Sequence, residues 1–168
     1  MDIKRKTLVV ILVVLVCQAS LAQNYQLHSV YIYSFIKYVE WPDRNSGDFV
    51  IGVYGDSPMT DHLKKMAAAK KAGDQRIVIK EIDDIQKLKG LHILFVPDAK
   101  SEEFDVISQN LDGSNTLIIT ESDGLGQVGS NINFVEKSGK LRFELNRSAM
   151  DKQNLKVSSE LTKLAILI

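Results

Sequence analysis

The stretch FVIGVYGDSP (Phe49–Pro58) contains the transition that decides the fold of this chain. Residues 49–54 are almost entirely apolar without alternation, which is typical of a strand buried on both faces within a parallel sheet. Gly55 then permits a tight turn, and the residues after it place polar side chains and a proline where a helix commonly begins. The stretch therefore predicts a buried strand that leads directly into a helix.

The same alternation of strand and helix continues along the chain. Short runs rich in valine and isoleucine predict further buried strands over Arg76 to Ile82, Leu91 to Val96 and Asn115 to Thr120. Helices are expected after Pro58, with Leu63, Met66 and Ala67 at helical spacing, and over Ile82 to Leu88 and Glu102 to Leu111. Strands joined by helices form right-handed crossovers, so we expect an α/β fold with an open, mostly parallel sheet and flanking helices.

The last third of the chain has a different pattern. In INFVEKSGKLRFEL (Ile132–Leu145), apolar and charged residues alternate on both sides of Ser138-Gly139, which predicts a C-terminal antiparallel hairpin at the edge of the sheet. Two short helices, Ser148 to Gln153 and Glu160 to Ile168, are expected to close the chain.

The first 22 residues have the features of a secretory signal peptide. Three basic residues precede an apolar run from Leu8 to Val16, which is much shorter than the roughly 20 residues that span a bilayer. Ser20 and Ala22 are small residues at the positions that a signal peptidase reads, so we expect cleavage between Ala22 and Gln23. Lipidation of Cys17 is the alternative, although Val16 stands where a small residue is usual. The expected organisation is a signal peptide over residues 1–22 and one α/β domain over residues 23–168.

Composition excludes several classes of function. The chain has 21 Lys and Arg and 21 Asp and Glu residues. The signal would remove three basic residues and one acidic residue, which leaves a net charge near −2. The sequence has no stripe of basic residues of the kind that binds nucleic acid, so nucleic acid is not an expected partner. The only cysteine, Cys17, lies in the predicted signal, so the exported domain would have neither a disulfide nor a thiol.

No catalytic residue, metal site or cofactor site is predicted. GLGQVG (Gly124–Gly129) matches the dinucleotide pattern GxGxxG, but strand-like residues follow it where that site requires a helix. We interpret it as a flexible glycine loop. His28, His62 and His92 do not have metal-ligand spacing, and no serine or cysteine stands in the context of a nucleophile.

A candidate ligand crevice lies where the predicted parallel strands end, because ligands of open α/β sheets bind beyond the carboxyl ends of the strands. The residues at these ends are Gly55, Asp56, Ser57, Asp98 and Glu121. Ordinary helix capping is the favoured explanation for the first three, and the charge of Asp56 disfavours a phosphate.

Aromatic residues are concentrated in YIYSFIKYVEWP (Tyr31–Pro42). On a helix, Leu27, Tyr31, Ser34, Tyr38 and Trp41 form one stripe, and Tyr33 lies on another face. Tyrosine and tryptophan carry much of the binding energy of protein interfaces, so Tyr31, Tyr33, Tyr38 and Trp41 are candidate residues of a partner or dimer interface. Packing within the core is the alternative. We expect Trp41 to be mostly buried and Tyr33 to be more exposed.

Four blocks of the chain together resemble the YfiR-like family of exported bacterial regulators. They are SFIKYVEWP, FVIGVYGDSPM, GSNINFVEKSGKLRFELN and LKVSSELTKLA, in this order over nearly all of residues 23–168. The resemblance implies an α/β sandwich, a periplasmic location, a homodimer, and function by protein contact rather than catalysis. In this family, a characterised regulator inhibits an inner-membrane diguanylate cyclase, and an outer-membrane protein can sequester it.

Two features depart from the family pattern. Regulators of this type carry disulfides, which the predicted mature chain cannot form, and Ser130-Asn131 replaces the glycine and methionine that are often found in the loop.

The sequence leaves two hypotheses about function open. The first is an adaptor that binds an inner-membrane sensor protein, a cyclase or a histidine kinase, and the second is a small-ligand module that uses the crevice and feeds a sensor or a transporter.

Overall fold

The computed structural model describes residues 25–42 and 47–168. The predicted signal peptide and its cleavage between Ala22 and Gln23 lie outside the described residues. Residues 25–38 are helical and are called here the aromatic helix. The other helices are α2 (Met59–Ala69), α3 (Phe104–Asn110), α4 (Leu125–Val128), α5 (Arg147–Lys152) and α6 (Ser159–Leu164), with 3-10 turns η1 (Ile85–Lys87) and η2 (Asp98–Glu103).

The strands form one large and one small sheet. They are β1 (Val39–Glu40), β2 (Phe49–Tyr54), β3 (Lys71–Ala72), β4 (Gln75–Ile82), β5 (Ile93–Val96), β6 (Leu117–Thr120), β7 (Ile132–Lys137), β8 (Lys140–Leu145), β9 (Lys156–Val157) and β10 (Ile166–Leu167). The large sheet has the order β10-β8-β7-β6-β5-β2-β4-β3, and β1 pairs with β9 in the small sheet. Strands β4, β2, β5, β6 and β7 run parallel. The predicted α/β fold with a mostly parallel sheet is confirmed.

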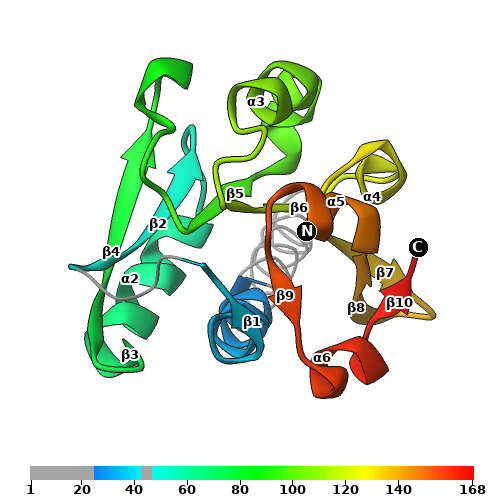
Figure 1. Ribbon diagram of the computed structural model, residues 1–168, viewed down its shortest axis with the longest axis horizontal. Helices are drawn as coiled ribbons and strands as arrows, with labels where there is room; N and C mark the ends of the chain where they lie inside the picture. Colours follow the sequence, from blue (N-terminus) through cyan, green and yellow to red (C-terminus); the bar gives the residue numbers. More distant parts are fainter. Residues whose placement is uncertain (1–24, 43–46) are drawn as a thin grey trace, which may run out of the picture.

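The large sheet lies between two layers of helices (Figure 1). The aromatic helix and α2 cover one face, over a core that includes Phe49, Phe95 and Phe143. Helix α3 covers part of the other face, where Phe104 and Ile107 pack on Leu94 and other residues. Strands β2, β5 and β6 are buried along nearly their whole length, because both of their faces carry a helical layer.

The hairpin of β7 and β8 is confirmed, with six antiparallel residue pairs. Ser138 and Gly139 have φ angles of 54° and 70°, as a two-residue turn between antiparallel strands requires. The predicted position at the sheet edge is wrong. Strand β10 pairs with the outer side of β8, and the helix expected over Glu160 to Ile168 ends at Leu164. The last residues are extended because the edge of β8 offers backbone partners, such as Leu145 O for Ile168 N at 3.1 Å.

The helix expected over Ile82 to Leu88 is also wrong. Ile82 ends strand β4 opposite Tyr54. Asp84 Oδ1 then accepts a hydrogen bond from Gln86 N at 2.9 Å, which starts only the short turn η1. The local side-chain bond stabilises a turn, and too few residues remain for a second helical turn.

The aromatic helix is attached to the C-terminal part of the chain through its own end. Strand β1 follows it directly and pairs with β9, and Ser158 N donates to Tyr38 O at 2.9 Å. Ser158 Oγ also caps α6 by accepting from Leu161 N. None of the helices in the described part of the chain has the length and apolar character of a membrane span.

Candidate functional site

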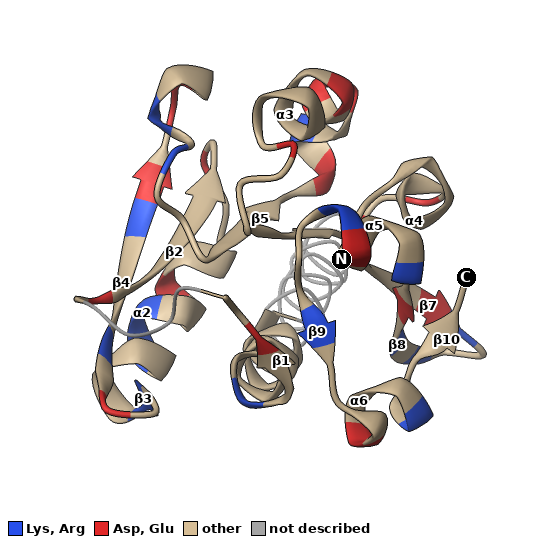
Figure 2. Ribbon diagram, in the orientation of Figure 1, with Lys and Arg blue, Asp and Glu red and all other residues tan. Residues whose placement is uncertain are grey.

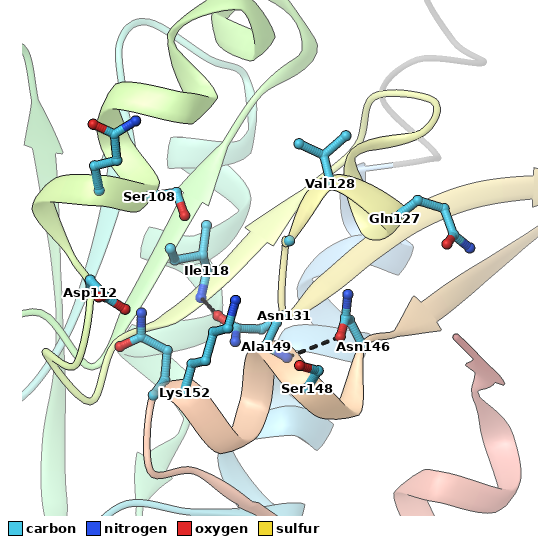
Figure 3. A pocket seen from close by; sticks show the side chains of 13 residues that line it. Ser108, Asp112, Ile118, Gln127, Val128, Asn131, Asn146, Ser148, Ala149 and Lys152 are labelled. Carbon is cyan, nitrogen blue, oxygen red and sulfur yellow. Dashed lines mark hydrogen bonds between the residues drawn. The ribbon is translucent and has the colours of Figure 1, made fainter.

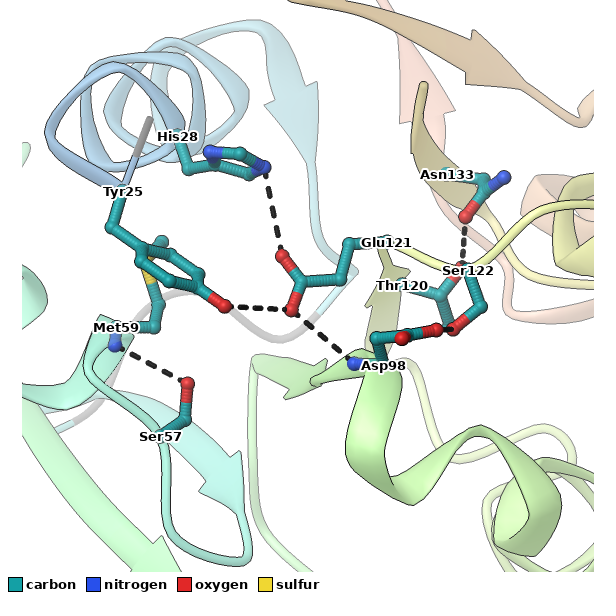
Figure 4. Close-up of polar contacts among 9 residues, drawn as sticks. All are labelled: Tyr25, His28, Ser57, Met59, Asp98, Thr120, Glu121, Ser122 and Asn133. Atoms are coloured by element: carbon teal, nitrogen blue, oxygen red, sulfur yellow. Dashed lines mark hydrogen bonds and ion pairs between the residues drawn. The ribbon is translucent and has the colours of Figure 1, made fainter. Parts of the chain in front are cut away.

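The carboxyl ends of β5 and β6 meet beneath the first residues of the aromatic helix (Figure 4). Glu121 follows β6, and its side chain is only 12% exposed. Its Oε1 accepts from Tyr25 Oη at 3.0 Å and from Asp98 N at 3.2 Å, and its Oε2 lies 3.7 Å from His28 Nε2. Ser122 Oγ donates to Asp98 Oδ1. The predicted crevice residues Asp98 and Glu121 are therefore brought together.

Burial changes the acidity of the groups at this point. Desolvation raises the pKa of Glu121, and hydrogen bonds from Asp98 N and Tyr25 oppose that shift. Desolvation, together with the nearby Glu121, raises the pKa of Tyr25 to about 12. The Tyr25 hydroxyl is thus held as a donor to a carboxylate that the fold has largely removed from water.

The chain's own side chains occupy this crevice. Gly55 has φ 74°, and a Cβ added there would lie 2.9 Å from Lys100 Cε. Lys100 in turn binds Glu103 at 2.7 Å. Ser57 is buried and its Oγ accepts from Met59 N, as expected for a residue at a helix start, while Asp56 is exposed and outside the cluster. The polar groups of the crevice mainly satisfy one another.

The aromatic helix buries a different stripe from the predicted one. The core-facing residues are His28, Ile32, Phe35 and Ile36 of the helix, followed by Val39 at the start of β1. These positions repeat at intervals of three and four residues and are mostly aliphatic, so they fit closely between the helix and the sheet. Leu27, which belongs to the predicted stripe, is 43% exposed, and Val30 is 57% exposed.

The four predicted interface residues have different environments. Trp41 is 7% exposed, packs edge-on against Phe49 at 5.1 Å and donates from Nε1 to His92 O at 3.1 Å. It is buried as expected, so its ring presents little surface to a partner. Tyr31, Tyr33 and Tyr38 are half-buried. The interface hypothesis therefore rests on the tyrosines.

A groove runs between the aromatic helix and α2. It has a volume of about 620 Å³ and is lined by Gln26, Ser29, Val30, Tyr33, His62, Lys65, Met66, Ala69 and Lys70. An adjoining hollow of about 520 Å³ shares Tyr33, Ala69 and Lys70, and adds Lys37 and Lys71. We call this combined surface the lysine-rimmed groove. Sequence reasoning identified Tyr33 but missed the residues of α2, because the packing of two helices cannot be read from either helix alone.

The segment Gly124–Gly129 is structured, and the flexible loop expected there is wrong. It contains the helical turn α4, in which Gly126 packs against the hairpin: an added Cβ would lie 2.9 Å from Ile168 and still closer to Glu144 Oε2. Strand β7 follows it, as predicted, so the arrangement differs from a dinucleotide site, where a helix of several turns follows the glycines.

A buried polar network connects β6 to the hairpin. Asn131 Oδ1 accepts from Ile118 N at 2.7 Å, Thr120 Oγ1 donates to Asn133 Oδ1 at 2.7 Å, and Asn133 Nδ2 donates to Glu144 at 3.1 Å. A polar hollow of about 560 Å³ between α3, α4 and α5 opens beside it (Figure 3). Asn131, which lines this hollow, already accepts a hydrogen bond from the backbone of β6. Its side-chain oxygen therefore stabilises the fold at this part of the hollow.

Comparison with known proteins agrees with this architecture. A family model described as YfiR/HmsC-like matches residues 25–166. The chain belongs to the YfiR/HmsC-like family. Two of the four sequence blocks that indicated the family form the scaffold of the YfiR/HmsC-like domain: GSNINFVEKSGKLRFELN builds the polar network and the hairpin, and LKVSSELTKLA holds the end of the aromatic helix.

Other comparisons show only the fold. The ABC domain in complex with L-Trp from Streptococcus pneumonia superposes with a TM-score of 0.55 at 10% sequence identity. The match covers 80% of this YfiR/HmsC-like chain and 58% of that chain, so our protein spans less than two thirds of its length. No curated protein matches.

The described residues contain no group of three or more His, Cys, Asp or Glu side chains placed to hold a metal ion. His92 is a half-buried residue whose Nδ1 accepts from Val50 N at 3.0 Å, and its ring stacks on Phe49. His28 faces Glu121 in the cluster described above.

Proposed function

We propose that this protein is an exported regulator that acts in the periplasm by contact with a membrane-bound signalling protein. The observation that carries the proposal is the exposed apolar face of the aromatic helix. Leu27 and Val30 are 43% and 57% exposed and lie one turn apart, beside the half-buried Tyr33. Exposed aliphatic side chains next to an aromatic ring are typical of a binding surface. Membership of the YfiR/HmsC-like family supports a regulatory role.

The partner that the family resemblance favours is the periplasmic sensor domain of an inner-membrane diguanylate cyclase, which this protein would inhibit. A histidine kinase with an exported sensor domain is the other candidate. Within the same proposal, the protein forms a homodimer and an outer-membrane protein can sequester it.

The proposal is tested by deleting the gene and measuring cyclic di-GMP. Loss of an inhibitor should raise the cyclic di-GMP level, and the wild-type gene should restore it. Complementation with Val30→Asp should fail, because a charge in the apolar face opposes contact with a partner. Complementation with Val106→Asp is the matched control, since Val106 is also exposed (49%) but lies on α3, on the other side of the sheet. Equal complementation by both variants would contradict the proposal, and no change in cyclic di-GMP on deletion would refute a diguanylate cyclase as the partner.

The small-ligand hypothesis receives less support from the geometry. Glu121 already accepts hydrogen bonds from Tyr25 and from Asp98 N, and Lys100 lies over Gly55. A ligand in this crevice would have to displace these groups, and breaking a buried hydrogen bond without replacement costs about 1–3 kcal/mol.

A further inference from the structure

The lysine-rimmed groove combines apolar lining residues with an unbalanced positive rim. The apolar lining residues are Val30, Tyr33, Met66 and Ala69. Lys37, Lys65, Lys70 and Lys71 surround it, and all four are exposed. Figure 2 shows positive residues on both helices that form the groove. Among residues 25–42 and 47–168, no carboxylate lines either hollow.

These lysines differ from others of the chain in their partners. Lys64, Lys87 and Lys100 each bind a carboxylate at 2.7 Å. Among the described residues, the four rim lysines have no carboxylate within ion-pair distance. Instead, the Nζ atoms of Lys37 and Lys70 lie 5.4 Å and 5.6 Å from the centre of the Tyr33 ring. The chain is neutral in total, so four unpaired positive charges at one groove are a local excess.

We infer that the lysine-rimmed groove binds an acidic amphipathic helix of the partner protein. This inference rests on the proposed function and specifies the chemistry of the partner. An amphipathic helix places apolar side chains in a groove between two helices and leaves its polar face at the rim. Its carboxylates would lie beside the rim lysines, and its apolar side chains would cover Val30 and Met66. The groove extends along the aromatic helix from Gln26 to Lys37, which is about 16 Å or three helical turns.

The inference is tested with a designed peptide and the protein purified from the periplasm. The probe is an amphipathic helical peptide of about 14 residues, enough for the three turns of the groove, with leucine on one face and glutamate on the other. A peptide with lysine in place of glutamate and a scrambled glutamate peptide are the controls. We expect the glutamate peptide to bind more tightly than both controls. We also expect its affinity to fall in about 0.5 M NaCl, where the screening length is about 4 Å.

Charge reversal locates the binding site. The double variant Lys65→Glu/Lys70→Glu should weaken binding by about tenfold, since exposed ion pairs contribute up to about 1 kcal/mol each. Lys137→Glu/Lys140→Glu is the matched control, because both lysines are exposed on the hairpin, far from α2, and it should leave binding unchanged.

Three results would overturn the inference: equal binding of the glutamate and lysine peptides, equal weakening by the two double variants, or a change from dimer to monomer caused only by the Lys65/Lys70 variant. The last result would mean that a second copy of this chain occupies the groove. If the peptide fails but Val30→Asp still abolishes regulation in cells, the proposed function stands and only the acidic helix is refuted.

Discussion

Replacing Trp41 by alanine should destabilise the fold much more than replacing Tyr33. Trp41 is 7% exposed and its ring packs edge-on against Phe49. Removing a buried tryptophan side chain typically costs about 3–5 kcal/mol, through lost transfer energy and the cavity left behind. Tyr33 is half-buried, with its ring beside Lys37 and Lys70, so its truncation should cost about 1 kcal/mol.

The variant Trp41→Phe separates packing from hydrogen bonding. Trp41 Nε1 donates to His92 O at 3.1 Å, and the same oxygen accepts from Leu117 N at 2.9 Å. Because that carbonyl keeps the bond from Leu117, losing the indole donor should cost only about 0.5–1.5 kcal/mol. The expected order of stability is wild type, then Trp41→Phe, then Trp41→Ala.

Thermal unfolding followed by circular dichroism measures these differences. For a domain of this size, each kcal/mol lowers the midpoint by about 3 °C, so Trp41→Ala should lower it by roughly 9–15 °C. Light scattering and a partner-binding assay on the same variants report association, which Tyr33→Ala should weaken. If Tyr33→Ala and Trp41→Ala destabilise the protein equally and association is unchanged, the aromatic helix is entirely core and the interface hypothesis is wrong.

Four further outcomes are expected. Asn131→Ala leaves the buried Ile118 N–H without its acceptor and should lower the free energy of unfolding, measured by urea denaturation, by about 1–3 kcal/mol; unchanged stability would contradict this. Burial raises the pKa of Glu121 above its ordinary value. The contribution of Glu121 to stability is therefore greatest below the ordinary carboxyl pKa and is lost as the pH rises through the folded-state pKa. The difference in thermal midpoint between Glu121→Gln and wild type should shift in favour of the variant from pH 4 to pH 7, and a constant difference would refute this reasoning. Titration with NAD or FAD should give no saturable signal, because a strand follows Gly124–Gly129, and micromolar binding would contradict that argument. Intact mass of the exported protein should place Gln23 first, and a lipid on Cys17 would disprove the predicted cleavage.

Many elements were predictable because their signals are local. A continuous apolar run such as Phe49–Tyr54 has only one favourable environment in a soluble domain, between two layers of helices. The alternation in Ile132–Leu145 likewise required an antiparallel hairpin, and the turn at Ser138-Gly139 has the positive φ angles that it needs. Other expectations failed where a distant partner determined the backbone. Residues 166–167 could not be assigned as a strand without knowing that the edge of β8 is open to them.

The candidate sites divide in the same way. The sequence by itself placed Asp98 and Glu121 at strand ends and determined that they are neighbours, because parallel strands end at one edge of a sheet. Only the tertiary structure decided that Tyr25 fills this crevice, since that contact joins residues 96 positions apart. The sequence also concentrated aromatic residues on one helix. Which side chains of that helix are buried was decided by the sheet beneath it, against which Phe35 and Ile36 pack while Val30 stays exposed. The four rim lysines come together only when α2 packs beside the aromatic helix, because hydrophobic burial positions the two helices and the charges on their outer faces follow.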